Sequence, residues 1–425
     1  MNSEILIFVE FIVFLFGFVY IFKREKLLGV YYFFLFVYAI FAQIGYLYFP
    51  ELSIFIKAYF CEGIWFRSTS LIILSFFFLL LGFALTWRSL VNFMPLTFFI
   101  SKSRYRIVEP AALILLVIVI FFQISYLILN FENINWYTNQ DEDFRAGNII
   151  FSLYILIFKY SVGINIVLYG VIKGAKGSFS RRFYIALLVA SMITFLVSAA
   201  RLGNRTDLLA FGLGIMIYHL YRDRFDLKRI LQISVAAALL GVGLYLVEIN
   251  RYSDGGVDLT FWAGLMTKDW YAPAHMLFAA VNHNIIDPIE VVVSNASNSL
   301  ILVGHPYLQY GITEAFNPGI ASRSAGYAFY IFTEGYMVLG DYGFIYNAML
   351  ILLGFSVWKK FASTNNKEFN NVMLGLMGCM VVNLVRGQGS YFIKYFYTFI
   401  LPSIFLYSAL SGQSLALIIK SKIFK

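Results

Sequence analysis

The chain has 425 residues, of which 60% are hydrophobic and 19% are aromatic. This apolar share exceeds what a soluble globular fold needs, so the composition excludes an ordinary soluble enzyme or binding module. The formal net charge of +9 would suit nucleic acid, but the basic residues follow a membrane topology instead, and we expect no nucleic-acid partner.

Runs of about 20 apolar residues predict membrane-spanning helices. We therefore expect an all-α polytopic membrane protein with about 11 spans (about 10–12), built as a single integral membrane domain over residues 1–425. In chain order the expected spans are Ile5–Phe22, Leu27–Tyr48, Leu71–Trp87, Ala111–Leu129, Ile149–Ile172, Tyr184–Ala200, Thr206–Tyr221, Ile230–Ile249, Phe332–Trp358, Val372–Val385 and Tyr391–Leu417.

The loops between these spans differ in charge. Most of the 32 Lys and Arg residues fall in alternate loops and in the C-terminal segment, and basic loops usually face the cytoplasm. We therefore place the C-terminus inside and the N-terminus outside. The longest connection, residues 250–326, falls on the outer side. A connection of that length usually is functional or contains helices of its own.

Five arginines run against this charge bias and lie at or near the outer ends of spans. They are Arg201, Arg205, Arg251, Arg323 and Arg386. A charge close to hydrocarbon is costly and usually faces a polar cavity or a ligand, and the guanidinium group matches phosphate oxygens. We predict that these arginines bind a phosphate-bearing substrate. The alternative for each is an interfacial anchor that reaches toward water, and for Arg323 it is also an ordinary solvated loop charge.

The segment Arg386-Gly387-Gln388-Gly389-Ser390 forms a short turn between two predicted spans. Glycines lack a Cβ atom, so the backbone N–H groups of such a turn can approach an anion closely. The turn is therefore predicted to contribute to the same phosphate site.

Two side chains are candidates for acid–base chemistry. Glu334 lies inside or at the cap of a span, where a carboxylate is costly unless it is paired; it serves either as a general base or in an ion pair with an arginine. His305, in Gly304-His305-Pro306-Tyr307, is either an acid–base group or an ordinary loop histidine.

The sequence gives no support for a metal or another cofactor. Asp141-Glu142-Asp143 mimics the acidic pair with which nucleotide-sugar transferases hold a divalent metal, but three acids on a polar loop are more often simply solvated. The 4 histidines lack the spacing of metal ligands. We expect a metal-independent protein.

Several of these segments resemble Wzy-type O-antigen polymerases. Residues 198–209, which contain Arg201 and Arg205, are similar to the Gly/Arg-containing segment of that family, and residues 334–343 are similar to its Glu-x-Tyr-x-x-x-Gly-x-x-Gly pattern. Arg251-Tyr252 and the turn at Arg386 resemble segments of enterobacterial common antigen polymerases. The resemblance covers roughly residues 198–410. Two departures are that Arg-Leu-Gly-Asn-Arg replaces the commoner Gly-Thr-Arg and that Gln388 stands one residue beyond the position of the family's acid.

The resemblance implies a GT-C-like membrane glycosyltransferase in the bacterial inner membrane, with its active site facing the periplasm. Its substrates would be oligosaccharides linked to undecaprenyl pyrophosphate, as both donor and acceptor, and a chain-length regulator protein would be a partner beside the lipid bilayer. The growing glycan would be transferred to the non-reducing end of a new repeat unit. Arg205 and the other arginines would stabilise the departing pyrophosphate, and Glu334 or His305 would deprotonate the acceptor hydroxyl.

Two other functions remain open at this point. An O-antigen ligase shares the many spans and the large outer loop, and outer arginines do not separate the two enzymes. A flippase for the lipid-linked oligosaccharide should line a path with charges at mid-membrane depth, whereas we place only Lys159 clearly deep within a span. The polar residues gather at one face, which favours chemistry at a surface over transit.

Overall fold

The computed structural model describes residues 3–49, 62–93, 96–100, 109–129, 149–174, 181–201, 205–222, 266, 272–300, 308–316, 328–413 and 415–419. The chain folds into two compact units. Unit 1 comprises Met1–Met94, Asp258–Lys360 and Val381–Phe396, and unit 2 comprises Pro95–Val257, Phe361–Met380 and Tyr397–Lys425. The single domain expected over residues 1–425 stays a prediction.

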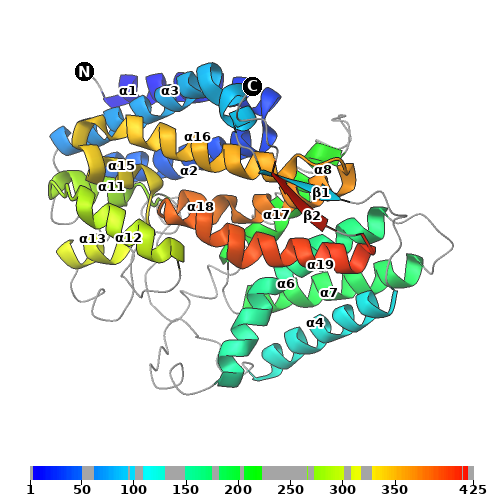
Figure 1. Cartoon of the computed structure of the whole chain (residues 1–425). Coiled ribbons are helices and arrows are strands. Elements are labelled where there is room, and N and C mark those ends of the chain that lie inside the picture. The colour runs from blue at the N-terminus through cyan, green and yellow to red at the C-terminus, as the bar shows by residue number, and fades with distance from the viewer. Residues whose placement is uncertain are drawn as a thin grey trace. The chain divides into compact units, whose positions relative to one another are not determined.

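Unit 1 begins with three long apolar helices, α1 (Ser3–Arg24), α2 (Lys26–Tyr48) and α3 (Glu62–Phe93) (Figure 1). Aromatic rings fill the space between them. Phe14 of α1 stacks on Phe36 of α2 with 3.9 Å between ring centroids, and Tyr32 of α2 meets Phe76 of α3 edge-on at 5.0 Å. Such pairs add to the area that they bury, so this three-helix packing forms a continuous core.

The rest of unit 1 contains shorter helices from the long connection and the C-terminal half. They are α11 (His275–Asn282), α12 (Pro288–Leu300), α13 (Leu308–Phe316), α15 (Ile331–Leu339), the 3₁₀ turn η1 (Gly340–Tyr342), α16 (Gly343–Ala362) and α18 (Ser390–Tyr395). Met276, Val291, Leu308, Phe329 and Met337 join α11, α12, α13 and α15 in one buried cluster. The long connection therefore contains helices, as its length suggested.

The span expected over Phe332–Trp358 is interrupted. α15 ends at Gly340, whose φ of +57° favours glycine, and α16 starts at Gly343. A Cβ atom on Gly343 would collide with the backbone of Gly335, so α15 and α16 pack together through two glycines. With 20 residues, α16 is about 30 Å long and can cross a bilayer without α15.

Unit 2 contains α4 (Glu109–Leu129), α6 (Ile149–Gly174), α7 (Arg181–Arg201), α8 (Arg205–Arg222), most of α17 (Lys367–Val385), the π-helical turn η2 (Phe396–Ile400) and α19 (Leu401–Ser411). α4, α6 and α7 lie side by side (Figure 1). α8 and α17 approach each other closely, because a Cβ atom on Gly375 would lie 3.1 Å from the carbonyl oxygen of Gly214. Small residues permit such contacts between apolar helices.

One short sheet departs from the all-α prediction. β1 (Leu96–Ile100) pairs antiparallel with β2 (Leu415–Ile419), with Phe98 opposite Leu417. The last helix was expected to reach Leu417, but it ends at Ser411, where Gly412 adopts the left-handed conformation with φ of 63°. Apart from this strand pair, the regular secondary structure of the described residues is helical.

Six helices in the described residues are long and apolar enough to cross a membrane: Ser3–Arg24, Lys26–Tyr48, Glu62–Phe93, Ile331–Ala362, Lys367–Val385 and Ser390–Ser411. The spans expected over Ala111–Leu129, Ile149–Ile172, Tyr184–Ala200 and Thr206–Tyr221 also coincide with helices, whereas Ile230–Ile249 lies outside the described residues.

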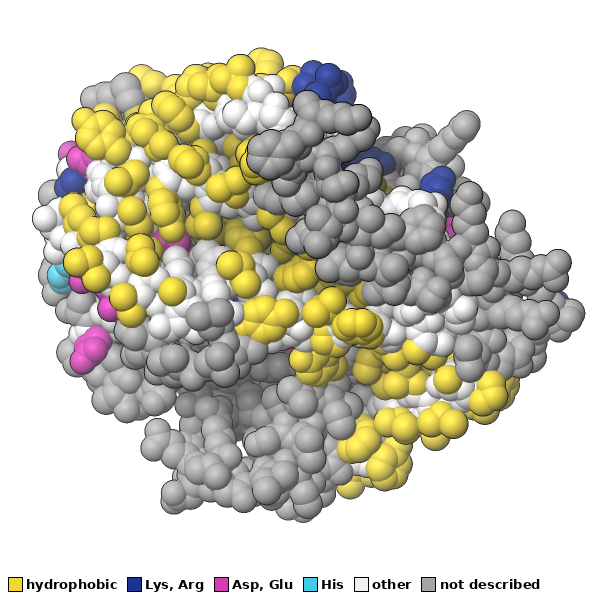
Figure 2. Space-filling model, viewed as in Figure 1, with side chains coloured by type: hydrophobic (Ala, Val, Ile, Leu, Met, Phe, Trp, Pro, Cys, Tyr) yellow, Lys and Arg dark blue, Asp and Glu magenta, His cyan; other side chains and the backbone are white. Residues whose placement is uncertain are grey.

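Large apolar side chains are exposed on several of these helices, among them Phe16 on α1, Leu85 on α3 and Phe121 on α4. Figure 2 shows hydrophobic side chains over much of the described surface that faces the viewer. Exposed apolar surface of this kind is unfavourable in water and suits contact with lipid. These observations fit a helical membrane protein.

Two ion pairs mark opposite ends of α16 within unit 1. Lys359, near its end, lies 2.9 Å from Glu25 in the turn between α1 and α2. Asp341, just before its start, lies 2.7 Å from Arg67 in the first turns of α3. The loop charges assign the first pair to the cytoplasmic side and the second to the outer side. The structure places these two ion pairs at opposite ends of α16, while the compartments that they face stay a prediction.

His275 makes the stability of unit 1 sensitive to acid. Burial in α11 lowers its pKa to about 4, against about 6.5 in an unfolded chain. Between these two pKa values the unfolded chain binds more protons than the folded one. The contribution of neutral His275 to the unfolding free energy is therefore complete above pH 6.5 and declines as the pH falls toward 4. It amounts to roughly 3 kcal/mol. We expect thermal unfolding in detergent to shift down over this range, and the shift to shrink in His275→Gln. His283→Gln, at the half-buried end of α11, is the control. An unchanged acid response in His275→Gln would contradict this assignment.

Candidate functional site

The candidate site in unit 1 is built around the carboxylate of Glu334, which is fully buried in the first turn of α15. Its Oε1 accepts hydrogen bonds from Asn295 Nδ2 at 2.7 Å and from the Tyr346 hydroxyl at 2.6 Å. Its Oε2 accepts one from the backbone N–H of Gly389 at 2.6 Å. All three donors are uncharged. The ion pair with an arginine, one of the two alternatives for this residue, is not among its contacts in the described structure.

Asn295 connects the helix α12 to the turn before α18. Its Nδ2 donates to Glu334, while its Oδ1 accepts from the backbone N–H of Ser390 at 3.0 Å and from Gln388 Nε2 at 3.1 Å. Both the Nδ2 and the Oδ1 atom of this one amide group therefore make hydrogen bonds. Because buried amides are stable only when such bonds are made, Asn295 fixes α12 against α15 and α18.

Gln388 completes the connection in the same way. Its Nε2 also donates to Ser294 Oγ at 3.3 Å, and its Oε1 accepts from the backbone N–H of Leu308 at 3.0 Å. Leu308 begins α13, so the Gln388 side chain satisfies one of the N–H groups that a helix start leaves without an internal partner. The turn therefore holds two helices of the long connection.

The glycine at position 389 explains why the chain can make this turn. A Cβ atom there would lie 2.9 Å from Glu334 Oε1 and 2.9 Å from Leu350 Cδ1. Both approaches are too close for a real side chain. Glycine therefore allows the backbone N–H to reach the buried carboxylate.

This geometry changes the role expected for the turn. The sequence suggested that its backbone N–H groups would bind a substrate anion. The N–H groups of Gly389 and Ser390 instead bind Glu334 and Asn295, and that of Arg386 binds the carbonyl oxygen of Val382 at 3.0 Å. Three of the five N–H groups of the turn are thus already used within the protein, and the half-buried side chain of Arg386 is its charged candidate for binding an anion.

Of the sequence-predicted site residues, the structure brings Glu334 together with the turn that begins at Arg386. The backbones of Arg201 and Arg205 end α7 and begin α8 in unit 2, and their side chains are not described. Arg251, His305 and Arg323 lie outside the described residues, as do Asp141, Glu142 and Asp143. No group of three or more His, Cys, Asp or Glu side chains that could hold a metal occurs among the residues described.

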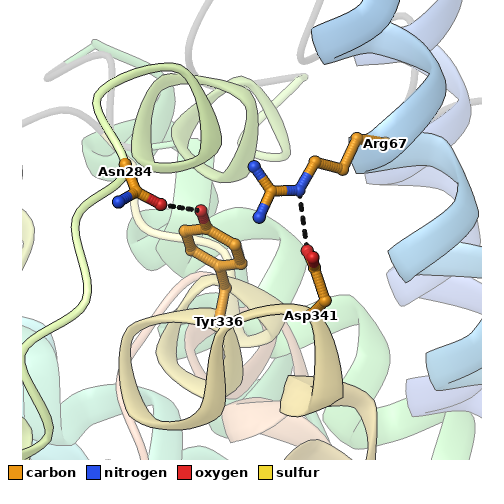
Figure 3. A network of polar contacts seen from close by, with 4 residues as sticks. All are labelled: Arg67, Asn284, Tyr336 and Asp341. Carbon is orange, nitrogen blue, oxygen red and sulfur yellow. Dashed lines mark hydrogen bonds and ion pairs between the residues drawn. The ribbon is translucent and has the colours of Figure 1, made fainter.

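A second polar network lies on the same helix, two residues beyond Glu334 (Figure 3). The Tyr336 hydroxyl donates to Asn284 Oδ1 at 3.2 Å, and the Arg67 guanidinium lies 5.6 Å from the Tyr336 ring centroid while its Nε bonds Asp341 at 2.7 Å. Asn284 has a φ of 48°, a conformation that asparagine tolerates better than most residues. Because the Arg67–Asp341 pair is solvent-exposed, it adds little stability itself, but the network fixes the link between α11 and α12.

Sequence reasoning missed the amide side chains that build this site. Asn295 and Gln388 belong to no charge pattern, and only the fold shows that they meet. Arg67 carried a signal, because it lies in the first turns of an apolar helix, much as Arg205 lies at the start of α8. Glu10 carried the clearest signal, as a lone carboxyl within the apolar run of α1. It adds a second ionisable side chain within a predicted span to Lys159.

Replacing Gln388 with glutamate tests the hydrogen bonds that its side-chain amide makes. Gln388→Glu would replace the Nε2 donor by a carboxylate oxygen, which would then face the acceptor atom Asn295 Oδ1. We expect a loss of about 2–4 kcal/mol in unfolding free energy, seen as lower thermal stability in detergent. Gln388→Met, which removes the bonds without adding charge, should lose less. A Gln388→Glu protein as stable as the wild type would refute the hydrogen-bond assignment.

Compared with protein-family models, with curated protein sequences and with solved structures, the chain matches none.

Proposed function

We propose that this protein is a membrane glycosyltransferase that polymerises lipid-linked oligosaccharide repeat units. In this proposal it transfers the growing glycan from undecaprenyl pyrophosphate to the non-reducing end of a new repeat unit on the same carrier. The reaction takes place at the periplasmic face of a bacterial inner membrane, and the product is O-antigen or a related surface polysaccharide. A chain-length regulator protein is the expected protein partner.

One observation carries the proposal. Three segments that are distant in sequence, namely α12 of the long connection, α15 with Glu334, and the turn that begins at Arg386, meet through buried hydrogen bonds. Two of these segments are the ones whose residues resemble the polymerase family. These segments meet at one end of unit 1, and the charges of the loops predict that this end faces outward. The arrangement supports chemistry at one membrane face.

The proposed mechanism assigns different tasks to the charged residues. The pyrophosphate is already a good leaving group, so the enzyme chiefly has to bind it and stabilise its growing negative charge. Arginines do this without a metal, and Arg386 is the candidate within the described site, with Arg201, Arg205, Arg251 and Arg323 as further candidates. Glu334 is fully buried, so we assign it the task of holding the Arg386 turn in place. This leaves His305 as the candidate base for the acceptor hydroxyl.

Two alternatives give different products when the gene is deleted. Loss of the polymerase should leave core carrying a single repeat, whereas loss of a ligase should remove all glycan from the core. The buried Glu10 in α1 favours a flippase, since intramembrane carboxyls mark many transport paths. Loss of a flippase should leave the repeat unit on the cytoplasmic face.

The deciding experiment is a clean deletion followed by gel analysis of the surface polysaccharide. We expect the long-chain ladder to disappear and core plus one repeat to accumulate. Polymerisation by the purified protein in detergent should survive excess EDTA. A normal ladder in the deletion strain would exclude the polymerase, and EDTA inhibition that Mg²⁺ reverses would exclude the metal-independent mechanism.

Cysteine labelling tests the membrane orientation that the proposal needs. In a background without the native cysteines, Ile289→Cys on α12, where the side chain is 76% exposed, should react with an impermeant reagent from outside. Ser363→Cys, exposed in the turn after α16, should react only after permeabilisation. The reverse labelling would place the Glu334 site in the cytoplasm and rule out the periplasmic reaction.

A further inference from the structure

A buried carboxyl in α1 forms a second polar centre that the proposed function does not use. Glu10 is fully buried in the midst of apolar residues of α1. Its Oε2 accepts a hydrogen bond from Gln43 Nε2 of α2 at 2.5 Å. The backbone carbonyl oxygen of Gln43 in turn accepts a bond from Trp65 Nε1 of α3 at 3.2 Å. The centre thus joins all three N-terminal helices.

No cation balances this carboxyl within the described structure. The titratable groups within electrostatic reach of Glu10 are the phenols of Tyr32 on α2 and Tyr330 before α15. Tyr330 donates its hydroxyl proton to the carbonyl oxygen of Leu35 at 3.0 Å, and the Tyr32 hydroxyl lies 3.5 Å from the carbonyl oxygens of Val13 and Phe76. The hydroxyl groups of both tyrosines thus point at backbone oxygens rather than at Glu10.

Two oxygens of the centre are left without a donor: Glu10 Oε1 and Gln43 Oε1 are buried and accept no hydrogen bond. An ionised carboxylate in this place would be an uncompensated buried charge, which costs several kcal/mol. A carboxylic acid has one O–H donor. A proton on Glu10 Oε1, donated to Gln43 Oε1, would give both oxygens their missing bond and remove the charge.

We propose that Glu10 is a proton-binding site within the membrane and forms a cyclic acid–amide pair with Gln43. The acid O–H donates to the amide oxygen, and the amide N–H donates to the acid carbonyl. The pair ties α1 to α2 without any buried charge, and Trp65 extends the connection to α3. This inference is independent of the proposed glycosyltransferase, because it involves none of the residues of the Glu334 site.

Infrared spectroscopy tests the proposal directly, since a protonated carboxyl and an ionised one absorb at different frequencies. At pH 8 an ordinary exposed glutamate is protonated in about 1 of 5,000 molecules. The spectrum of the purified wild type minus that of Glu10→Gln should nevertheless show one protonated C=O band, and this band should shift in D₂O. A pair of ionised carboxylate bands in its place would overturn the proposal.

A second variant keeps the test decisive if Glu10→Gln does not fold. Gln43→Leu retains Glu10 but removes the acceptor of its proton. The wild-type minus Gln43→Leu spectrum at pH 8 should contain a protonated C=O band displaced in frequency, with one positive and one negative lobe. The absence of this feature would show that Gln43 does not receive the Glu10 proton. Glu4→Gln, an exposed position on the same helix, should give only ionised carboxylate bands.

Discussion

Substituting Gly389 with alanine is expected to abolish the long-chain polysaccharide. The new Cβ atom would lie 2.9 Å from Glu334 Oε1 and from Leu350 Cδ1, so the turn has to move away from α15. That movement breaks the 2.6 Å bond between Gly389 N–H and Glu334, and a bond to a charged group contributes about 1.5–3 kcal/mol. The measurement is the polysaccharide ladder in a deletion strain that expresses the variant, together with its thermal unfolding in detergent.

Gly311→Ala is the matched control. Gly311 lies in α13, and nothing lies within 4 Å of its Cβ position. Alanine favours a helix interior over glycine by about 1 kcal/mol, so this variant should keep a normal ladder and unfold at the same or a higher temperature. If Gly389→Ala behaves like Gly311→Ala, the tight turn at Glu334 is unimportant for activity.

The same comparison separates two roles of Glu334. If Glu334 positions the turn, Glu334→Gln and Asn295→Leu should lose activity and thermal stability together, because each leaves buried donors or acceptors without partners. If Glu334 takes the acceptor proton itself, Glu334→Gln should be inactive at wild-type stability, while Asn295→Leu keeps substantial activity. The second result would return Glu334 to the role of general base.

The sequence predicted the helices of this protein well because length and hydropathy alone decide them. Apolar runs of about 20 residues have few alternatives to a helix in a membrane. α1 and α2 lie close to where the sequence placed them, whereas α3 contains the expected span Leu71–Trp87 but runs from Glu62 to Phe93. The break at Gly340 was harder to predict, since glycine is also tolerated within membrane helices. It became visible only through the positive φ of Gly340 and the contact between Gly343 and Gly335.

The candidate site was predictable only in its charged members. Glu334 and Arg386 attracted attention because charge near hydrocarbon is rare. Asn295 and Gln388 did not, because an amide in an outer helix or turn is ordinary until the fold shows what it touches. The sequence also could not indicate that the N–H groups of Gly389 and Ser390 are occupied, since Glu334 is 55 positions from Gly389. The binding of an anion by the turn backbone therefore stays a prediction, and it does not extend to the N–H groups of Gly389 and Ser390.

Replacing Arg386 should have the other large effect on polymerisation. The N–H groups of Gly389 and Ser390 bind Glu334 and Asn295, so we expect the Arg386 side chain to supply the charged contact from this turn to pyrophosphate. Loss of one charge-assisted contact in a partly dehydrated site costs about 2–4 kcal/mol, or roughly 30- to 1,000-fold in rate. We expect Arg386→Ala to make no long-chain ladder while it inserts at normal levels. Arg386→Lys should also be strongly impaired, because lysine lacks the planar fork of the guanidinium.

Arg205, at the start of α8, should respond in the same way if it also binds pyrophosphate, with Arg205→Ala and Arg205→Lys both defective. Arg88→Ala is the control, since Arg88 is exposed on α3 toward the end that the loop charges place in the cytoplasm, and it should leave the ladder intact. A pure interfacial anchor needs only positive charge and a long stem, so lysine would serve it as well as arginine. Full activity in both Arg→Lys variants would therefore identify Arg205 and Arg386 as membrane anchors and refute their contact with pyrophosphate.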